Sequence, residues 1–274
     1  MLKKIRVFDV IRIIALLFFL GVLLYPSVSN YLFQMNSSKV IESYEESIYG
    51  IDDNTKKKML LEARQYNTSL ISSEVLYDPF SSDGKQDRYY NSLLSLSHDG
   101  MIGYIRIPKI DVELPIYHGT SEGVLQKGIG HLEGTSLPIG GSSTHAVLTG
   151  HRGLPSAKLF TELDMIEEGD VFYIKVLGNT LAYEVDQILT VLPHEMSALN
   201  IERGKDYVTL VTCTPYAVNT HRMLVRGHRI PYEEANHIQK DEHVGNQIPL
   251  EYIVLCLGVI ILFGIVMVMR KIKR

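Results

Sequence analysis

The sequence predicts a mainly β domain, folded as a closed barrel or a sandwich and set between two membrane-spanning helices. Between about Tyr104 and Val225 the chain consists of short apolar or alternating runs separated by Gly and Pro. This stretch lacks the regular alternation of strands and helices that is typical of a parallel sheet. Both ends of the chain are long apolar segments flanked by basic residues.

Residues 10–26 are expected to form a transmembrane helix or signal anchor after a cytoplasmic tail of residues 1–9. Thirteen residues from Ile13 to Tyr25 carry no charge. A bilayer core needs about 20 apolar helical residues, so this segment is marginal unless Arg12 reaches the headgroups. A cleaved signal peptide is the alternative, but no A-x-A-like cleavage site follows Tyr25, which favours a retained anchor.

Residues 250–269 are the clearer membrane segment. Tyr252 to Met269 are eighteen uncharged, strongly apolar residues, and the basic tail of residues 270–274 follows at once. Basic residues therefore flank the outer end of both segments. The positive-inside rule then places both termini in the cytoplasm and residues 27–251 outside the cell.

The formal net charge of −4 conceals an uneven distribution of charged residues. Removing the eight basic residues at the two ends and Asp9 leaves 19 basic and 30 acidic residues. The part between the membrane segments is thus strongly acidic. A nucleic-acid-binding protein needs a basic surface to neutralise phosphates, so nucleic acid is not an expected partner.

Residues 27–75 are expected to be a helical N-terminal region. Met59, Ala63, Tyr66 and Leu70 repeat at helical spacing, and Asp53 or Asn54 could cap the start of that helix. The following stretch is rich in Ser, Asp and Gly, which predicts a loop over residues 76–90. A loop of this length is usually either functional or poorly ordered.

Residues 91–232 are expected to form the β domain, and residues 233–249 a polar linker to the second membrane segment. Gly178-Asn179 between two apolar runs is a strong hairpin signal. We expect seven or eight strands with one or two helices between them, at the following runs: Tyr104–Ile107, Val112–Ile116, Ala146–Leu148, Val171–Leu177, Leu181–Val185, Gln187–Leu192, Tyr207–Thr212 and Met223–Val225.

The two cysteines of the chain indicate that Cys213 is a candidate functional residue. The chain has two cysteines, and Cys256 lies inside the second membrane segment, so the external domain holds one thiol with no internal disulfide partner. A lone external cysteine is unusual, although many free cysteines are merely small buried apolar residues. Cys213 ends one strand and Arg222 begins the next, so an antiparallel pair brings them close together. Side chains alternate along a strand, so His221 then faces away from the thiol.

A base for this thiol must come from elsewhere in the chain. Only about 3% of a thiol is ionised at pH 7, and a nearby imidazole or guanidinium favours the thiolate. His151 is the best placed histidine, because it follows the apolar run Ala146–Thr149 and Gly150 at the rim of the sheet. His118 and His131 also lie beside glycines. No HxxxH or HExxH spacing and no cysteine pair is present, so we expect neither a metal nor another cofactor.

These segments resemble the sortases, the membrane-anchored cysteine transpeptidases of Gram-positive bacteria. Thr209–Cys213 is similar to the TLxTC signature of that family, Arg222 to its active-site arginine, and Leu148–His151 to its catalytic histidine segment. Other segments are similar to class C, the pilus-assembling sortases: Gly103–Pro108, Pro115–Gly119, Gly130–Thr135, Val218–Arg222, the second membrane segment and Asp78-Pro79-Phe80.

The resemblance implies an eight-stranded barrel, with Cys213 as nucleophile, His151 as general acid and base, and Arg222 stabilising the substrate carbonyl or oxyanion. It also implies that Asp78, Pro79 and Phe80 form a lid, with Asp78 against Arg222 and Phe80 over Cys213. An ordinary Asp-Pro surface turn is the alternative for this tripeptide.

The implied reaction cleaves an LPXTG-like sorting signal between Thr and Gly and joins it to a lysine amine of a pilin subunit. Pilin subunits are therefore the expected partners. Anchoring of surface proteins to cell-wall peptidoglycan, a thiol hydrolase and a non-enzymatic surface scaffold are the alternatives.

Overall fold

The computed structural model describes residues 7–71, 77–81, 87–96 and 100–235, together with Ile238 and Gly258. The chain divides into two compact units. One unit contains the N-terminal part of the first helix, as far as Gln34. The other contains residues 35–154 and 158–243, which hold the sheet and every candidate site residue.

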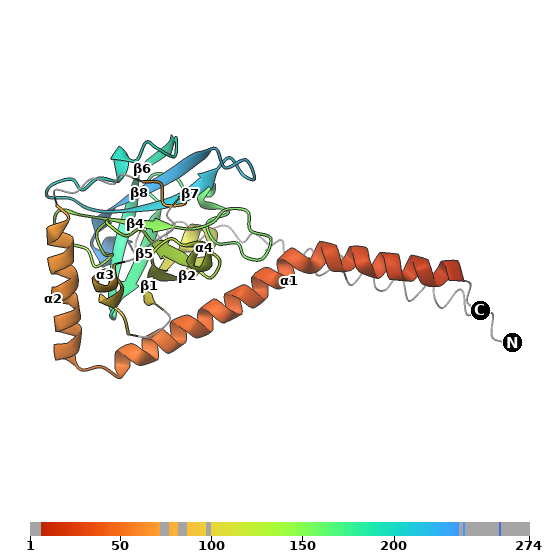
Figure 1. The fold of residues 1–274 in the computed structure, drawn as a ribbon, viewed down its shortest axis with the longest axis horizontal. Coiled ribbons are helices and arrows are strands. Elements are labelled where there is room, and N and C mark those ends of the chain that lie inside the picture. Colours follow the sequence, from red (N-terminus) through yellow and green to blue (C-terminus); the bar gives the residue numbers. More distant parts are fainter. Residues whose placement is uncertain are drawn as a thin grey trace. The chain divides into compact units, whose positions relative to one another are not determined.

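Eight strands close into a barrel, which confirms the predicted fold class (Figure 1). The order around the barrel is β1-β2-β3-β4-β7-β8-β6-β5. Neighbouring strands are antiparallel except for the parallel pairs β2–β3 and β4–β7. The strands are β1 Met101–Ile107, β2 Val112–His118, β3 Ile129–His131, β4 Thr144–Thr149, β5 Val171–Val176, β6 Asn179–Val191, β7 Asp206–Thr214 and β8 His221–Ile230.

The observed strands differ from the expected runs at two places. The runs on either side of Asp186 form the single strand β6, because a bulge there shifts the register against β8 between Val185 and Gln187. The bulge interrupts the side-chain alternation, so the sequence suggests a break where the strand continues. The three-residue strand β3 was not predicted, since it is too short to show a period.

The α-helices are α1 Val7–Tyr49, α2 Asp53–Ser69, α3 Arg88–Ser92 and α4 Glu122–Leu125, and three 3₁₀ turns lie at Pro108–Ile110, Leu163–Met165 and Ser197–Leu199. Asp52 caps α2 by accepting hydrogen bonds from the backbone N–H groups of Asn54 and Thr55. The expected cap at Asp53 or Asn54 was therefore wrong by at least one residue. Helix ends are the least certain feature of a sequence-based assignment, because Asp and Asn cap equally well.

Helix α1 continues without a break through Pro26. From Ile14 onward it includes an 18-residue window of mean hydropathy 1.7, and it is the one helix among the described residues long and apolar enough to cross a membrane. The second expected membrane segment, residues 250–269, lies outside the described residues apart from Gly258.

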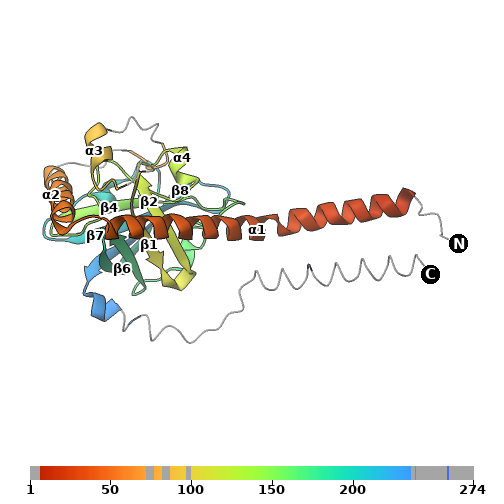
Figure 2. The ribbon, with the colours of Figure 1, turned by 90° about the horizontal axis from the view of Figure 1, so that it is seen from below.

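The last turns of α1 pack across the outside of β1 and β2 (Figure 2), where Ile41, Tyr44 and Ile48 are buried. The Tyr44 hydroxyl donates to the Ile102 carbonyl at 2.9 Å and accepts from the Leu177 N–H at 3.0 Å. The buried hydroxyl thus ties this part of α1 to β1 and to the turn between β5 and β6.

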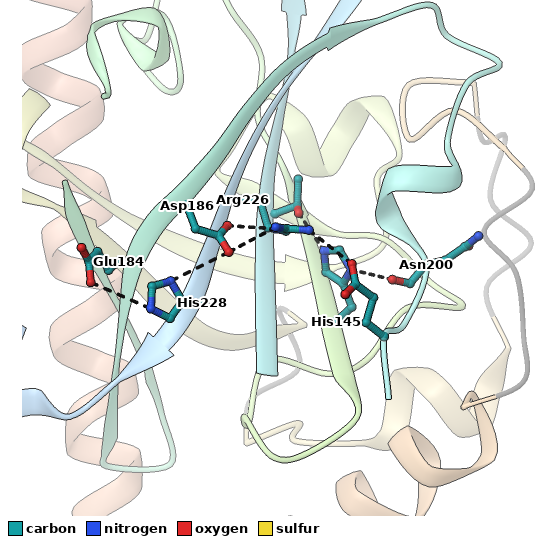
Figure 3. A network of polar contacts seen from close by, with 8 residues as sticks. His145, Glu184, Asp186, Asn200, Arg226 and His228 are labelled. Atoms are coloured by element: carbon teal, nitrogen blue, oxygen red, sulfur yellow. Dashed lines mark hydrogen bonds and ion pairs between the residues drawn. The ribbon is translucent and has the colours of Figure 1, made fainter. Parts of the chain in front are cut away.

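A polar network crosses the barrel wall at His145 on β4 (Figure 3). The ring nitrogens of His145 lie 3.0 Å from the Asn200 carbonyl and 2.7 Å from the Thr209 hydroxyl. A carbonyl only accepts, so Nδ1 carries the hydrogen and Nε2 accepts from Thr209. Nearby, Arg226 donates from Nε and Nη2 to both carboxylate oxygens of Asp186, the residue at the bulge in β6.

Two buried histidines should make folding sensitive to acid. Burial lowers the pKa of His145 to about 4 and that of His131 to about 3. Each histidine of the unfolded chain binds a proton below about pH 6.5, whereas in the folded chain it stays neutral to lower pH. Stability should therefore fall as the pH drops from about 6.5 to about 4, by up to about 1.4 kcal/mol per pH unit for each histidine.

Urea denaturation across this pH range, on the soluble fragment 27–251, would measure the effect. His145→Gln should be less stable at neutral pH but show a shallower pH dependence. The exposed His194 supplies the matched control, because His194→Gln should keep the wild-type dependence. An unchanged slope in His145→Gln would show that this histidine does not carry the acid sensitivity.

Candidate active site

Strand pairing brings Cys213 and Arg222 together. Cys213 is the penultimate residue of β7, and Arg222 is its direct partner on the antiparallel strand β8. Both residues are buried, each with 8% exposure. Directly opposed residues have Cβ atoms about 5 Å apart, so the guanidinium is within reach of the thiol.

The pairing of β4 with β7 brings His151 to the same edge of the barrel. These strands run parallel, from Thr144 opposite Asp206 to Thr149 opposite Val211, and their carboxyl ends therefore meet. Two hydrogen bonds extend the pairing beyond β4: the Gly150 N–H donates to the Val211 carbonyl at 3.1 Å, and the Thr212 hydroxyl donates to the Gly150 carbonyl at 2.8 Å. His151 thus leaves the sheet beside the end of β7.

Gly150 has little space for a side chain. A Cβ at this position would lie 2.7 Å from the Phe160 ring and 2.8 Å from Ile129, closer than packed atoms allow. The missing side chain lets Phe160 close over the end of β4. The Phe160 N–H then donates to the His151 carbonyl at 3.1 Å, which fixes the backbone that carries the imidazole.

Asp78 forms a two-pronged ion pair with Arg222. Its carboxylate oxygens accept from Nε of Arg222 at 2.8 Å and from Nη2 at 2.5 Å. The Asp78 side chain is 11% exposed and that of Arg222 is 9% exposed, so the pair is shielded from water. A bidentate charge-assisted pair is among the strongest polar contacts that a protein makes.

Pro79 and Phe80 follow Asp78 in the chain and lie beside the same candidate site residues. Asp78 Oδ1 also accepts from the Phe80 N–H at 3.2 Å, which holds the turn, and Pro79 is buried. The Phe80 ring lies 5.7 Å from the His151 ring and 5.0 Å from the guanidinium carbon of Arg222. The expected position of Phe80 was over Cys213; the described contacts of its side chain include His151, Arg222 and the apolar cluster that contains Val147, Val211 and Leu224.

Burial and the charges of Asp78 and Arg222 together set the pKa of the Cys213 thiol. Burial raises the pKa of Cys213; the Arg222 charge lowers it in part, and the Asp78 charge raises it further. Burial works to lower the pKa of Arg222, but the hydrogen bond with Asp78 and the charge of Cys213 raise it overall. With Asp78 in place, Arg222 is neutralised by a carboxylate, and the protonated thiol is favoured.

Two charged residues that the sequence reasoning missed lie beside the site. Glu122 on α4 has its Oε2 atom 3.3 Å from Nε2 of His151. Arg152 donates from Nη1 to the Thr214 hydroxyl at 3.2 Å and forms an ion pair with Asp164, so it links the His151 segment to the end of β7. Neither belongs to a local motif. The signal that could have found them is the barrel order, which was not deducible without the short strand β3.

No metal centre is found in the part of the chain that the structure describes: no group of three or more His, Cys, Asp or Glu residues there is arranged to hold an ion. His118 and His131, the other histidines considered, are buried in the barrel wall away from this edge. His131 lies 2.7 Å from the Tyr90 hydroxyl and 2.8 Å from the Ser136 carbonyl, which gives it a structural role.

Comparison with known proteins agrees with this fold. A family model described as Sortase domain matches residues 105–230. The crystal structure of Sortase C of Streptococcus pneumoniae is 48% identical and has a TM-score of 0.65, covering 71% of this chain and 97% of that one. Sortase C1 of Streptococcus agalactiae is 51% identical with a TM-score of 0.65, covering 70% of this chain and 98% of that one.

More distant relatives belong to other sortase classes. Sortase D of Bacillus subtilis is 26% identical over 168 residues, which are 61% of this chain and 79% of that protein. The barrel and the similarity over nearly the full length of the two streptococcal structures define a cysteine transpeptidase of the sortase type. The chain belongs to the sortase family and, within it, to class C.

The contacts of Asp78 and Phe80 predict that this segment shields the thiol. Asp78→Ala or Phe80→Ala should raise the alkylation rate of Cys213 by about 5- to 150-fold, the range of about 1–3 kcal/mol of coupling. The loop should also become more sensitive to protease, with little change in barrel stability. Asp78→Asn should move the alkylation profile to lower pH, because the Asp78 charge contributes to raising the pKa of Cys213.

Alkylation with a small thiol reagent, followed by mass spectrometry across a pH series, would measure these rates. Tyr89→Ala serves as control, since Tyr89 is an exposed aromatic residue beyond the segment. Equal rates in the wild type and in the Asp78 and Phe80 variants would mean that the segment does not shield Cys213.

Proposed function

We propose that Cys213 is the nucleophile of this sortase, His151 its general acid and base, and Arg222 the group that stabilises the developing oxyanion. The observation that carries the proposal is the meeting of β4, β7 and β8 at one edge, which gathers a thiol, an imidazole and a guanidinium. Arg222 stays charged at any working pH, so it both favours the thiolate and offers hydrogen bonds to a carbonyl oxygen.

The substrate we propose is an LPXTG-like sorting signal, cleaved between Thr and Gly. The Cys213 thiolate attacks the Thr carbonyl, His151 protonates the departing Gly amine, and a thioester remains on the sulfur. A lysine of the next pilin subunit then takes the acyl group as an isopeptide. A lysine amine is less than about 0.1% neutral at pH 7, so the second step needs His151 as a base.

The printed titles of the related structures support pilin as the substrate class. The Streptococcus pneumoniae structure is described in terms of pilin substrate specificity, and a Group B Streptococcus relative as a pilus-related Sortase C, 46% identical and covering 70% of this chain. The apolar part of α1 supports attachment to a membrane. A membrane-anchored enzyme with its barrel outside the cell meets substrates that emerge from the same bilayer.

Asp78, Pro79 and Phe80 are proposed to act as a lid that keeps the enzyme at rest. While Asp78 holds Arg222 and Phe80 packs on His151, neither of these two groups is free to meet a substrate. The apparent affinity for the sorting signal is then reduced by the fraction of molecules in which the lid is open.

The test of the proposed reaction is incubation of the soluble fragment 27–251 with an LPXTG-type peptide, with and without acceptors. A covalent adduct on Cys213 and an amide product with a lysine-containing pilin peptide are expected. Release of the peptide to water alone would indicate a hydrolase. Preference for a peptidoglycan-type amine over the pilin lysine would indicate cell-wall anchoring in place of pilus assembly.

Substitutions at the three proposed catalytic residues should separate their roles from folding. Cys213→Ala should abolish transpeptidation with a native circular dichroism spectrum, because truncation at a strand end removes little packing. His151→Ala and Arg222→Ala should each lower the rate by about 100-fold or more, as general acid–base and oxyanion groups do. Activity within about tenfold of wild type in either variant would remove that residue from its role.

A further inference from the structure

Glu122 places an exposed carboxylate next to the imidazole of His151. One oxygen, Oε2, lies 3.3 Å from Nε2 of His151. The other, Oε1, accepts a hydrogen bond of 2.8 Å from the side-chain amide of Gln126, one turn along. The carboxylate is therefore held by one oxygen and presents the other to the imidazole.

The two partners in this contact differ sharply in their access to solvent. The Glu122 side chain is 66% exposed, whereas that of His151 is 19% exposed. Nε2 of His151 is shielded from solvent and makes no hydrogen bond to any residue that the structure describes. Glu122 thus contacts the shielded imidazole while most of its own side chain stays exposed to solvent.

The other charged groups near His151 are already paired with other residues. Asp78 comes from the lid segment and binds Arg222 with both oxygens. Arg152, the next residue along the chain, pairs with Asp164. Among the described residues at this edge, Glu122 is the carboxylate that reaches His151 without being engaged by an arginine.

We propose that Glu122 binds the ammonium group of the acceptor lysine and delivers it to His151. The inference rests on the proposed transpeptidase function and adds a recognition site for its second substrate. A lysine amine arrives as a cation, so it needs a carboxylate for binding and a base for activation. An ammonium group next to Oε2 of Glu122 is also next to Nε2 of His151.

The chemistry of the step balances on these groups. The ammonium gives one proton to the neutral imidazole of His151, and the resulting amine attacks the thioester carbon. The N–C bond forms, the C–S bond breaks, and the electron pair of that bond leaves on the Cys213 sulfur. The second proton lost by the nitrogen goes to that thiolate, which restores the thiol, and the product is an amide.

The test compares a charged acceptor with an uncharged one. Full-length enzyme in detergent micelles, with Asp78→Ala in every sample to open the lid, is acylated by an LPXTG-type peptide. The thioester is then resolved either by a lysine-containing peptide or by hydroxylamine, which is largely uncharged at neutral pH. The ratio of the two kcat/KM values reports recognition of the ammonium independently of acylation.

Glu122→Gln should lower this ratio by about two- to fivefold, the scale of a solvent-exposed charge pair. Added salt should lower the ratio in the Glu122 enzyme but not in the Glu122→Gln enzyme, because salt screens exposed charges. Glu122→Asp, which keeps the charge, should retain more of the preference than Glu122→Gln. The exposed Glu168, in the turn before β5, supplies the control Glu168→Gln, which should leave the ratio unchanged.

Equal losses with both acceptors in Glu122→Gln would overturn the proposal, since Glu122 would then act only by positioning His151. A ratio unchanged in Glu122→Gln would overturn it as well. Failure of the Glu122 enzyme to form a thioester or hydroxamate would instead contradict the proposed transpeptidase function. The two failures are therefore distinguishable in the same experiment.

Discussion

The parallel pairing of β4 with β7 is the constraint on which the site depends. A hairpin alone brings Cys213 to Arg222, because adjacent antiparallel strands need only a short loop. His151 is more than sixty residues away in sequence, and it lies beside the end of β7 because parallel strands end at the same edge. The hydrogen bonds of Gly150 with Val211 and Thr212 extend that pairing to the residue before the imidazole. The arrangement of the three candidate site residues therefore depends on how the strands pair to close the barrel.

The ion pair between Asp78 and Arg222 sets the electrostatics of this geometry. A guanidinium that faces a thiol favours the thiolate, but the Asp78 carboxylate that holds this guanidinium raises the pKa of Cys213 and offsets part of that effect. Burial of Cys213 acts in the same direction, since a charged sulfur is disfavoured away from water. In the lid proposed above, one segment would block the site sterically, and the Asp78 charge that it carries raises the pKa of Cys213.

Sequence reasoning identified the features that local patterns encode. The length of the β7–β8 connection placed Arg222 close to Cys213, and side-chain alternation meant that Arg222 and His221 could not both face the thiol; the structure pairs Cys213 with Arg222. It failed where tertiary structure overrides local pattern, at the bulge of β6 and at the short strand β3. Glu122 lies just before β3, so missing that strand also hid the neighbour of His151. The lid contacts came from family resemblance, because a tripeptide in a polar loop carries no geometric signal of its own.

The charges of the site divide it into two sides. Asp78 and Arg222 form an ion pair on the side of β8, and Glu122 approaches His151 from α4 with most of its side chain exposed. A transpeptidase must handle an acyl donor whose developing charge is negative and an amine acceptor whose initial charge is positive. Arg222 is a cation beside the sulfur, which suits the negative charge of the acyl donor. Glu122 is an anion beside the proposed base, which suits the positive charge of the amine acceptor. The Asp78–Arg222 ion pair lies on the cationic side, so a lid built on it would act on the acyl-donor half of the proposed reaction.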